Sequence, residues 1–90
     1  MDIPEEERFF DQWETEYYAN GSNTKGKLVI TNKAVYFNNI RLEKTNILES
    51  SSYRKFFLKS HVVIKMKDGL EYEFQFGLGS VHQILSAIDS

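Results

Sequence analysis

The chain has 90 residues, a length that supports one hydrophobic core and excludes two independent domains. Its apolar fraction of 41%, with seven Phe, five Tyr and one Trp, excludes disorder as the main state. The absence of cysteine excludes disulfide scaffolds, thiol catalysis and cysteine-bound zinc, and it fits a reducing compartment.

The formal net charge of −2 is divided unevenly along the chain. Residues 1–20 hold seven acidic side chains and one basic, whereas residues 21–90 hold six acidic and ten basic. A duplex-DNA binder carries clustered Lys and Arg and a strongly basic domain, so we expect no nucleic-acid partner. No apolar run approaches the roughly 18 residues of a membrane span, and no basic-then-apolar leader is present. We therefore expect a soluble, cytoplasmic protein.

The first 20 residues fit two interpretations. Pro4 before three glutamates is typical of a helix start, and four aromatic residues lie on one helical face: Phe9, Phe10, Trp13 and Tyr17. The aromatic run Thr15–Ala19 before the turn pair Asn20-Gly21 instead favours a strand. We favour a short helical turn that leads into a strand. Residues 20–26 (NGSNTKG) then predict a polar loop.

Residues 27–38 predict a tight hairpin. A two-residue loop at Asn32 and Lys33 pairs apolar residues with apolar residues, namely Ile30 with Val35 and Leu28 with Phe37. Residues 40–59 are less regular. They predict one or two short strands, then a bend or an edge at the three serines 50–52, and then a strand over 53–58.

Residues 61–76 carry the strongest pattern, because apolar and polar residues alternate through two runs. A three-residue loop at 67–69, with Gly69 in the left-handed conformation, predicts an antiparallel hairpin that pairs Ile64 with Tyr72 and Lys65 with Glu71. Residues 79–89 predict a helix with a capping box from Ser80 to Gln83 and one apolar stripe: Val81, Ile84, Leu85 and Ile88. Six or seven antiparallel strands and one helix give an α+β, mainly β, class.

Several of these segments resemble GRAM and bacterial PH-like domains. Residues 26–37 (GKLVITNKAVYF) are similar to the family's G-x-L-x-L-T-N-x-R-L-I-F hairpin, and residues 41–47 resemble its I-x-L-x-x-I strand. Residues 62–76 resemble its I-x-x-K-D-G-x-x-Y-x-F hairpin, and the C-terminal helix stands where the family places a capping helix. The similarity covers residues 7–89.

The resemblance implies a PH-like split barrel of two near-orthogonal antiparallel sheets, capped by one C-terminal α-helix. It also implies that residues 1–90 form a single GRAM-type domain, with an acidic aromatic N-terminal segment at 1–13 and the capping helix at 79–89. Such a domain is a binding module without catalysis, but the fold alone does not identify a ligand.

In lipid-binding relatives, basic residues on the first two strands and their loop bind phosphorylated head groups. The matching positions here are Lys25 and Lys27, with Lys33 and Arg41 as neighbours. The sequence departs from the family pattern at Ala34, where the family has Arg, and in the lack of an Arg after Lys27. The anionic membrane surface is therefore the alternative partner.

The inventory for catalysis is small, so we expect no enzyme, no cofactor and no metal. The two histidines are far apart in sequence, and we expect both at the surface, His61 on the outer face of its strand and His82 on the solvent side of the helix. Zinc needs about four ligands, which the chain does not group together. Lys65 and Glu71 predict an exposed cross-strand pair.

The aromatic residues give a different set of candidates. Phe56 and Phe57 are neighbours that face opposite ways on a strand, so one of them is predicted to be exposed. With Phe9 and Trp13 they are the candidate partner contacts. The sequence therefore predicts a small interaction module that binds a protein partner or self-associates. A peripheral membrane binder is the alternative.

Overall fold

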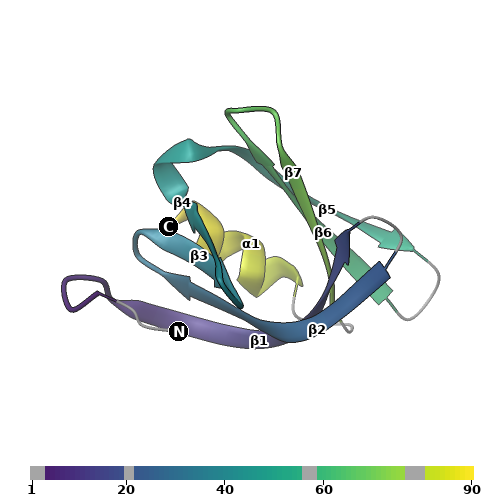
Figure 1. Ribbon diagram of the computed structural model, residues 1–90, viewed down its shortest axis with the longest axis horizontal. Helices are drawn as coiled ribbons and strands as arrows, with labels where there is room; N and C mark the ends of the chain where they lie inside the picture. Colours follow the sequence, from purple (N-terminus) through teal and green to yellow (C-terminus); the bar gives the residue numbers. More distant parts are fainter. Residues whose placement is uncertain (1–3, 20–21, 56–58, 77–80) are drawn as a thin grey trace.

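The computed structural model describes residues 4–19, 22–55, 59–76 and 81–90. In these ranges one antiparallel sheet has the strand order β4-β3-β2-β1-β7-β6-β5. Figure 1 shows the sheet curving around the C-terminal helix. The elements are β1 (Phe9–Ala19), β2 (Ser22–Thr31), β3 (Ala34–Phe37), β4 (Ile40–Glu43), the 3-10 turn η1 (Lys44–Asn46), β5 (Ile47–Lys55), β6 (Lys59–Met66), β7 (Glu71–Phe76) and α1 (Val81–Asp89).

Both predicted hairpins are confirmed. β2 pairs with β3 so that Leu28 faces Phe37 and Ile30 faces Val35, across a two-residue turn. β6 pairs with β7 so that Ile64 faces Tyr72, and the amide of Gly69, at φ +96°, bonds the carbonyl of Met66 at 3.0 Å. In each hairpin the apolar pattern and the turn residues specify the same register, because a slip of one residue would turn an apolar face to solvent.

In the N-terminal third the predicted turn that leads into a strand is confirmed, but the strand begins earlier than predicted and the predicted polar loop is wrong in part. A single turn closes from the amide of Glu7 to the carbonyl of Pro4 at 3.0 Å, and β1 then begins at Phe9. The predicted polar loop at 20–26 is wrong over residues 22–26, because β2 already begins at Ser22 and pairs with β1 along its length. Backbone pairing with an 11-residue partner strand compensates for the lack of apolar side chains there. The turn pair at 20–21 lies outside the described residues.

The predicted barrel of two near-orthogonal sheets is wrong. β1 pairs with β2 on one side and, through residues 16–18, with β7 on the other, so both halves belong to one continuous sheet. The hydroxyl of Thr15 extends this joint by donating to the carbonyl of Gln75 at 2.8 Å. β4 and β5 are the two edges of the sheet and do not pair with each other, so the sheet does not close.

The core lies on the face of the sheet that α1 covers (Figure 1). Tyr17 of β1 contacts Phe37 and Phe74 with ring centroids 5.6 and 5.3 Å apart, so aromatic side chains connect the two halves of the sheet. Two residues of the predicted helical stripe, Ile84 and Ile88, are buried. The remaining buried apolar residues of the core are Leu28, Ile30, Val35, Leu42, Val62, Ile64, Met66 and Phe76.

The middle of the chain forms the second edge. β5 continues through the three serines that predicted a bend or an edge, and β6 is its one partner among the described strands. The edge prediction is therefore confirmed and the bend is not. α1 begins at Val81, and the predicted cap at Ser80 lies outside the described residues.

Candidate functional site

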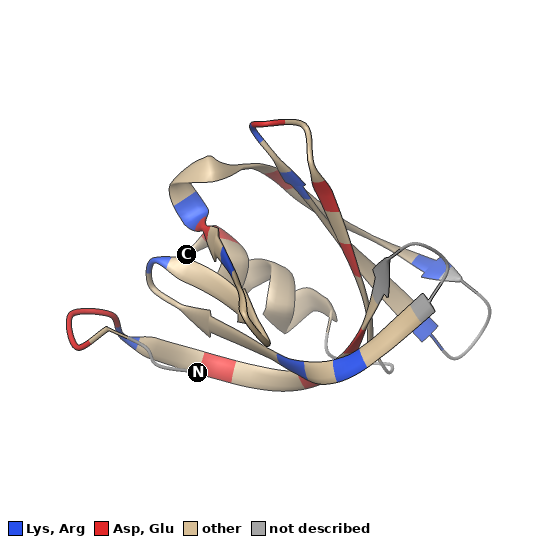
Figure 2. Ribbon diagram, viewed as in Figure 1, with Lys and Arg blue, Asp and Glu red and all other residues tan. Residues whose placement is uncertain are grey.

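The four basic candidates do not form one cluster. Lys25 and Lys27 are exposed on β2, opposite Glu16 and Glu14 of β1, because the register pairs those positions. Side chains at paired positions of an antiparallel sheet point to the same face, so each lysine has a carboxylate as its cross-strand neighbour. Figure 2 shows basic and acidic positions interspersed along these two strands. Lys33 lies in the β2–β3 turn, away from them along the strand.

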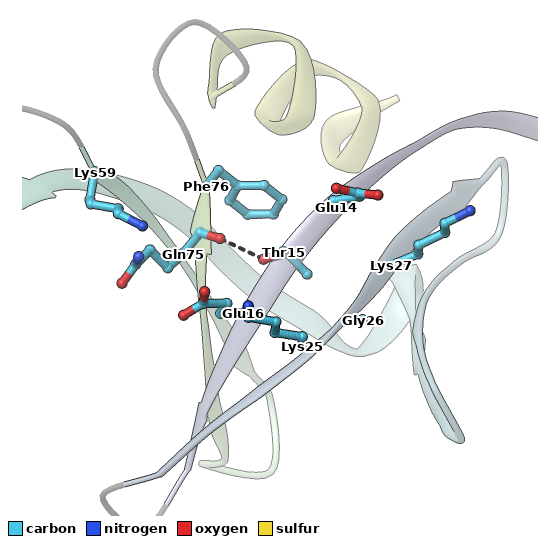
Figure 3. A pocket seen from close by; sticks show the side chains of 9 residues that line it. All are labelled: Glu14, Thr15, Glu16, Lys25, Gly26, Lys27, Lys59, Gln75 and Phe76. Carbon is cyan, nitrogen blue, oxygen red and sulfur yellow. Dashed lines mark hydrogen bonds between the residues drawn. The ribbon is translucent and has the colours of Figure 1, made fainter.

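A pocket of about 490 Å³ lies at the joint between β1 and β7, and it contains Lys25 and Lys27. Lys59, at the start of β6, is a third lysine in its lining. In Figure 3, Lys25 and Lys59 extend toward the Gln75 side of the pocket and Lys27 extends to the opposite side. The other lining residues are Glu14, Thr15, Glu16, Gly26 and Phe76.

The charge in this pocket is mixed. Three lysines against two glutamates leave an excess of one positive charge. Among the described residues these lysines make no ion pair within 4 Å. The pocket can therefore attract an anion, although two carboxylates in its wall oppose that attraction. Lys59 was missed in the sequence because it is about 30 residues from Lys25 and Lys27, and no local pattern connects them.

Arg41 is not a free cation, because two acidic side chains already bind it. Its Nη2 lies 2.5 Å from Oε1 of Glu7, and its Nε donates to Oε1 of Glu43 at 2.5 Å. Hydrogen bonds to these two carboxylates raise the pKa of Arg41 above its ordinary value. Arg41 Nη1 also donates to the hydroxyl of Tyr36. Arg41 is therefore part of an internal network.

Glu7 lies at the centre of that network, and the sequence analysis did not identify it. Its side chain is 1% exposed, and its Oε2 accepts hydrogen bonds from the hydroxyls of Tyr36 at 2.6 Å and Thr31 at 3.0 Å. The hydrogen bond with Arg41 lowers the pKa of Glu7 and outweighs the opposite effect of burial. Burial, followed by the hydrogen bond to Glu7, raises the pKa of Tyr36 to about 12.

The aromatic candidates separate in the structure. Phe9 is 52% exposed, whereas Trp13 is half-buried and packs against the core. Both line a groove of about 540 Å³ between β1 and α1, and the helix contributes Ser86 and Ala87 to its lining. Phe56 and Phe57 lie outside the described residues.

β5 carries two more exposed apolar residues. Leu48 is 64% exposed and Tyr53 is 43% exposed. Both lie on the strand that ends the sheet, with β6 as its partner in the described residues. The sequence analysis placed a strand here but did not select these side chains.

His61 was expected to be exposed at the surface, and this expectation is wrong. His61 does lie on the face opposite Val62 and Ile64, but it is 2% exposed. Its Nδ1 lies 2.7 Å from Oε2 of Glu73, and its ring stacks on Tyr53 at 4.9 Å between centroids. The hydroxyl of Tyr53 donates to the same Oε2 at 2.6 Å. Tyr53 of β5 and Glu73 of β7, the strands on either side, therefore cover a position that the alternation assigned to solvent.

Two other expectations are confirmed. His82 is exposed on α1. Lys65 and Glu71 form a cross-strand pair at 3.6 Å, and Glu49 lies at the same distance from Lys65 on its other side. In the described ranges, no three His, Asp or Glu side chains are placed to hold a metal ion together. The helix in those ranges lacks the length and apolar character needed to cross a bilayer.

Comparisons with known proteins identify the fold and no family. No family model matches the chain, and no curated protein matches it. Among solved structures, the C-terminal domain of an unknown protein from Leishmania infantum is similar, with a TM-score of 0.78 and 13% sequence identity. The match covers 93% of this chain and 86% of that one. At this identity the likeness concerns the fold alone, and the resemblance to GRAM domains stays a prediction.

Proposed function

We propose that this chain is a non-catalytic interaction module that binds an extended segment of a protein partner along the open edge of β5. The observation that carries the proposal is the position of β5 at the end of the sheet, where β6 is its partner and its other side pairs with no described strand. An open edge offers a row of backbone N–H and C=O groups that can hydrogen-bond an added strand.

The composition of β5 supports this use of the edge. Natural edge strands are commonly protected by proline, lysine or a central bulge. The middle of β5 has three successive serines, and its irregularity lies at the start, between Ile47 and Glu49. Small side chains allow another backbone to approach closely. The centre of the strand therefore lacks the features that block strand addition.

The exposed side chains at either end of the serines could provide selectivity. Leu48 precedes them and Tyr53 follows them, and both are substantially exposed. The hydroxyl of Tyr53 is held by Glu73, which fixes the ring against His61. Backbone pairing contributes affinity, and fixed side chains that flank the edge select the residues of the added strand.

Proline scanning tests the proposal. Alternate N–H groups of an edge strand point to its neighbour and to the open side. Ser51→Pro and Ser52→Pro should therefore differ, since one removes a hydrogen bond to β6 and the other only blocks the edge. The variant that keeps the wild-type unfolding transition is selected. Displayed peptides of 7–9 residues that are selected for binding to the wild-type protein should not bind this proline variant.

Leu70→Ser is the matched control, because Leu70 is 55% exposed in the distant β6–β7 loop and should leave peptide binding unchanged. Selected peptides should also protect the amides of residues 48–54 from hydrogen exchange. A dimer that the blocking proline dissolves would identify a second copy as the partner at this edge. No peptide enrichment from a strict monomer, or equal binding by the proline variant, would contradict the proposal.

A second candidate function is weak binding of anionic lipid head groups in the pocket at the β1–β7 joint. The observation that favours it is the presence of Lys59 together with Lys25 and Lys27. Binding to vesicles with anionic lipid should weaken as salt rises, because exposed charges are screened.

Charge reversal tests this second candidate. The double variant Lys25→Glu, Lys27→Glu should lose vesicle binding in sedimentation, while Lys67→Glu, which changes an exposed lysine outside the pocket, should retain it. Equal binding by wild type and the double variant would exclude this pocket as the lipid site.

A further inference from the structure

The side chains that surround Glu7 form a binding site for a carboxylate. Arg41, Tyr36 and Thr31 come from β4, β3 and the end of β2, and all three approach the carboxylate of Glu7. Thr31 is fully buried and Tyr36 is 3% exposed. One guanidinium and two hydroxyl donors in a site of this kind match the two oxygens of a carboxylate.

The site is held in place without help from Glu7. Glu43 keeps the guanidinium of Arg41 oriented through Nε. The hydroxyl oxygen of Thr31 accepts the amides of Lys33 and Ala34 at 3.1 and 3.0 Å, which fixes it in the β2–β3 turn. If Glu7 left, Thr31 could still donate to the carbonyl of Ala34 at 3.3 Å, but the buried hydroxyl of Tyr36 and Nη2 of Arg41 would lose their acceptor. Those two donors favour the entry of another carboxylate.

The segment that supplies Glu7 is attached at two residues, through the side chain of Glu7 and the backbone of Arg8. Pro4, Glu5 and Glu6 are exposed, so Glu7 is the one buried residue of the described turn. Among the described residues, the contact of Glu7 Oε1 is Arg41 Nη2 at 2.5 Å. Withdrawal of residues 4–8 would remove one buried side chain and the two hydrogen bonds between Arg8 and Asn32, and would leave the sheet paired from Phe9 onward.

The next residue shows how a bound segment is oriented. The amide of Arg8 donates to Oδ1 of Asn32 at 2.7 Å, and its carbonyl accepts the amide of Asn32 at 2.9 Å. The side chain of Arg8 is exposed. The position after the acidic residue is therefore recognised through its backbone, and its side chain is free to vary.

We propose that this pocket, formed by Thr31, Tyr36 and Arg41 with Asn32 beside it, is a receptor for an acidic residue of another protein segment, which Glu7 occupies from within the chain. The ligand is an extended peptide with a glutamate followed by any residue. Glu43 beside Arg41 neutralises the guanidinium, so a singly charged carboxylate fits the site better than a doubly charged phosphate. This site is separate from the β5 edge and does not depend on the function proposed there.

A free peptide must compete with Glu7 for this site, and the tether of Glu7 to the chain determines how tightly the peptide must bind. A group tethered by a few residues competes at an effective concentration on the order of millimolar. A free acidic peptide should therefore bind wild type poorly and should bind a variant without the Glu7 carboxylate at least about tenfold more tightly.

The test uses the full chain with Glu7→Ala. The probe is a synthetic peptide with the sequence of residues 4–10 (PEEERFF), and its matched control has all three glutamates replaced by glutamine. Titration followed by NMR should shift the Asn32 amide and the Arg41 Nε–H signal, and only the glutamate peptide should bind. Adding Arg41→Gln to the variant should abolish binding. Glu6→Ala, which changes an exposed glutamate, should behave as wild type.

Other results distinguish the alternatives. If Glu7→Ala does not fold, the glutamate peptide should restore its dispersed spectrum, and failure to restore it would overturn the proposal. Absence of binding by a folded variant would also overturn it, as would inorganic phosphate binding more tightly than the peptide. A wild-type dimer that Glu7→Ala dissolves would identify a second copy as the source of the carboxylate and support the site.

Discussion

The carboxylate of Glu7 is buried while charged, an arrangement that is costly unless positive charge and hydrogen bonds compensate for the lost water. Arg41, Tyr36 and Thr31 provide that compensation. The consequence at the residue scale is that the protonation state of Glu7 is linked to folding. The hydrogen bond with Arg41 keeps its pKa below the ordinary value of 4.5, so the native state binds a proton less readily than the unfolded state.

This linkage predicts a specific effect of acid on wild type and Glu7→Gln. At pH 7 the variant should be less stable by about 1–3 kcal/mol, because a charged hydrogen-bond acceptor is lost from a buried site. The Glu7 contribution is complete above the ordinary pKa of 4.5 and disappears as pH falls through the lower native pKa.

Urea unfolding of both proteins between pH 7 and pH 2.5 checks the prediction. The two stability curves should converge below pH 4.5. Parallel curves across that range would mean that Glu7 is not ionised in the native state. Glu5→Gln, at an exposed position of the same turn, is the control and should follow wild type.

At the scale of elements, Lys44 connects the η1 turn to the end of α1. Its Nζ donates to the carbonyl oxygens of Ala87 at 2.7 Å and Ser90 at 3.1 Å, and it lies 4.8 Å from the centre of the Phe10 ring. The last carbonyls of a helix have no partner within the helix, and their dipoles favour a cation. Lys44 therefore fixes α1 to two parts of the sheet.

Lys44→Met keeps the length of the side chain and removes the charge and the donors. We expect a loss of about 1–2 kcal/mol of unfolding free energy, since hydrogen bonds from a charged donor and the helix dipole both contribute. Hydrogen exchange should accelerate in the last turn of α1 before it changes in β6. Lys67→Met, at an exposed position, is the control. Equal stability of Lys44→Met and wild type would show that the helix end is held by other contacts.

At the scale of the whole molecule, Phe74 joins the two halves of the sheet. It is fully buried on β7, and its ring centroid lies 5.3 Å from those of Tyr17 on β1 and Phe37 on β3. The backbone joint between β1 and β7 covers only residues 16–18 of β1. The cohesion of the fold therefore depends on aromatic packing more than on the number of strand pairs.

Phe74→Ala should lower the unfolding free energy by about 3–5 kcal/mol, a large part of the roughly 5–13 kcal/mol expected for 90 residues. Urea unfolding followed by circular dichroism and by Trp13 fluorescence should give coincident curves for wild type, because one core stabilises both halves. Leu70→Ala, at an exposed position, should change stability by less than about 0.5 kcal/mol. A Phe74→Ala protein as stable as that control would contradict the role of this ring.

Local signals in the chain were enough for the hairpins and much of the helix. The register of β2 with β3 and of β6 with β7 follows from alternating apolar residues next to specific turn residues, with partners only a few positions apart. Strand formation at residues 22–26 was missed because its cause is the partner strand β1. The need for glycine at position 26 also comes from a neighbouring strand, because a Cβ there would lie 2.9 Å from the ring of Phe37 on β3.

The candidate sites were less accessible to sequence reasoning. Lys25 and Lys27 were selected correctly as exposed basic residues, but their cross-strand glutamates and Lys59 depend on pairing between distant segments. Arg41 was selected as a free cation and is bound to Glu7, 34 positions earlier in the chain. His61 was assigned to the correct face, but its burial depends on side chains from β5 and β7.

The amino-acid sequence alone determined the short-range structure: the turns, the apolar faces of the hairpins and the stripe of α1. These depend on interactions between near neighbours, whose geometry repeats every two residues or about every 3.6. Only the tertiary structure decided that the halves form one sheet, since Thr15 and Gln75 meet across 60 positions. It also decided that Glu7 is buried against Arg41. Contacts of that range leave no periodic signal, because they depend on how complete elements pack against one another.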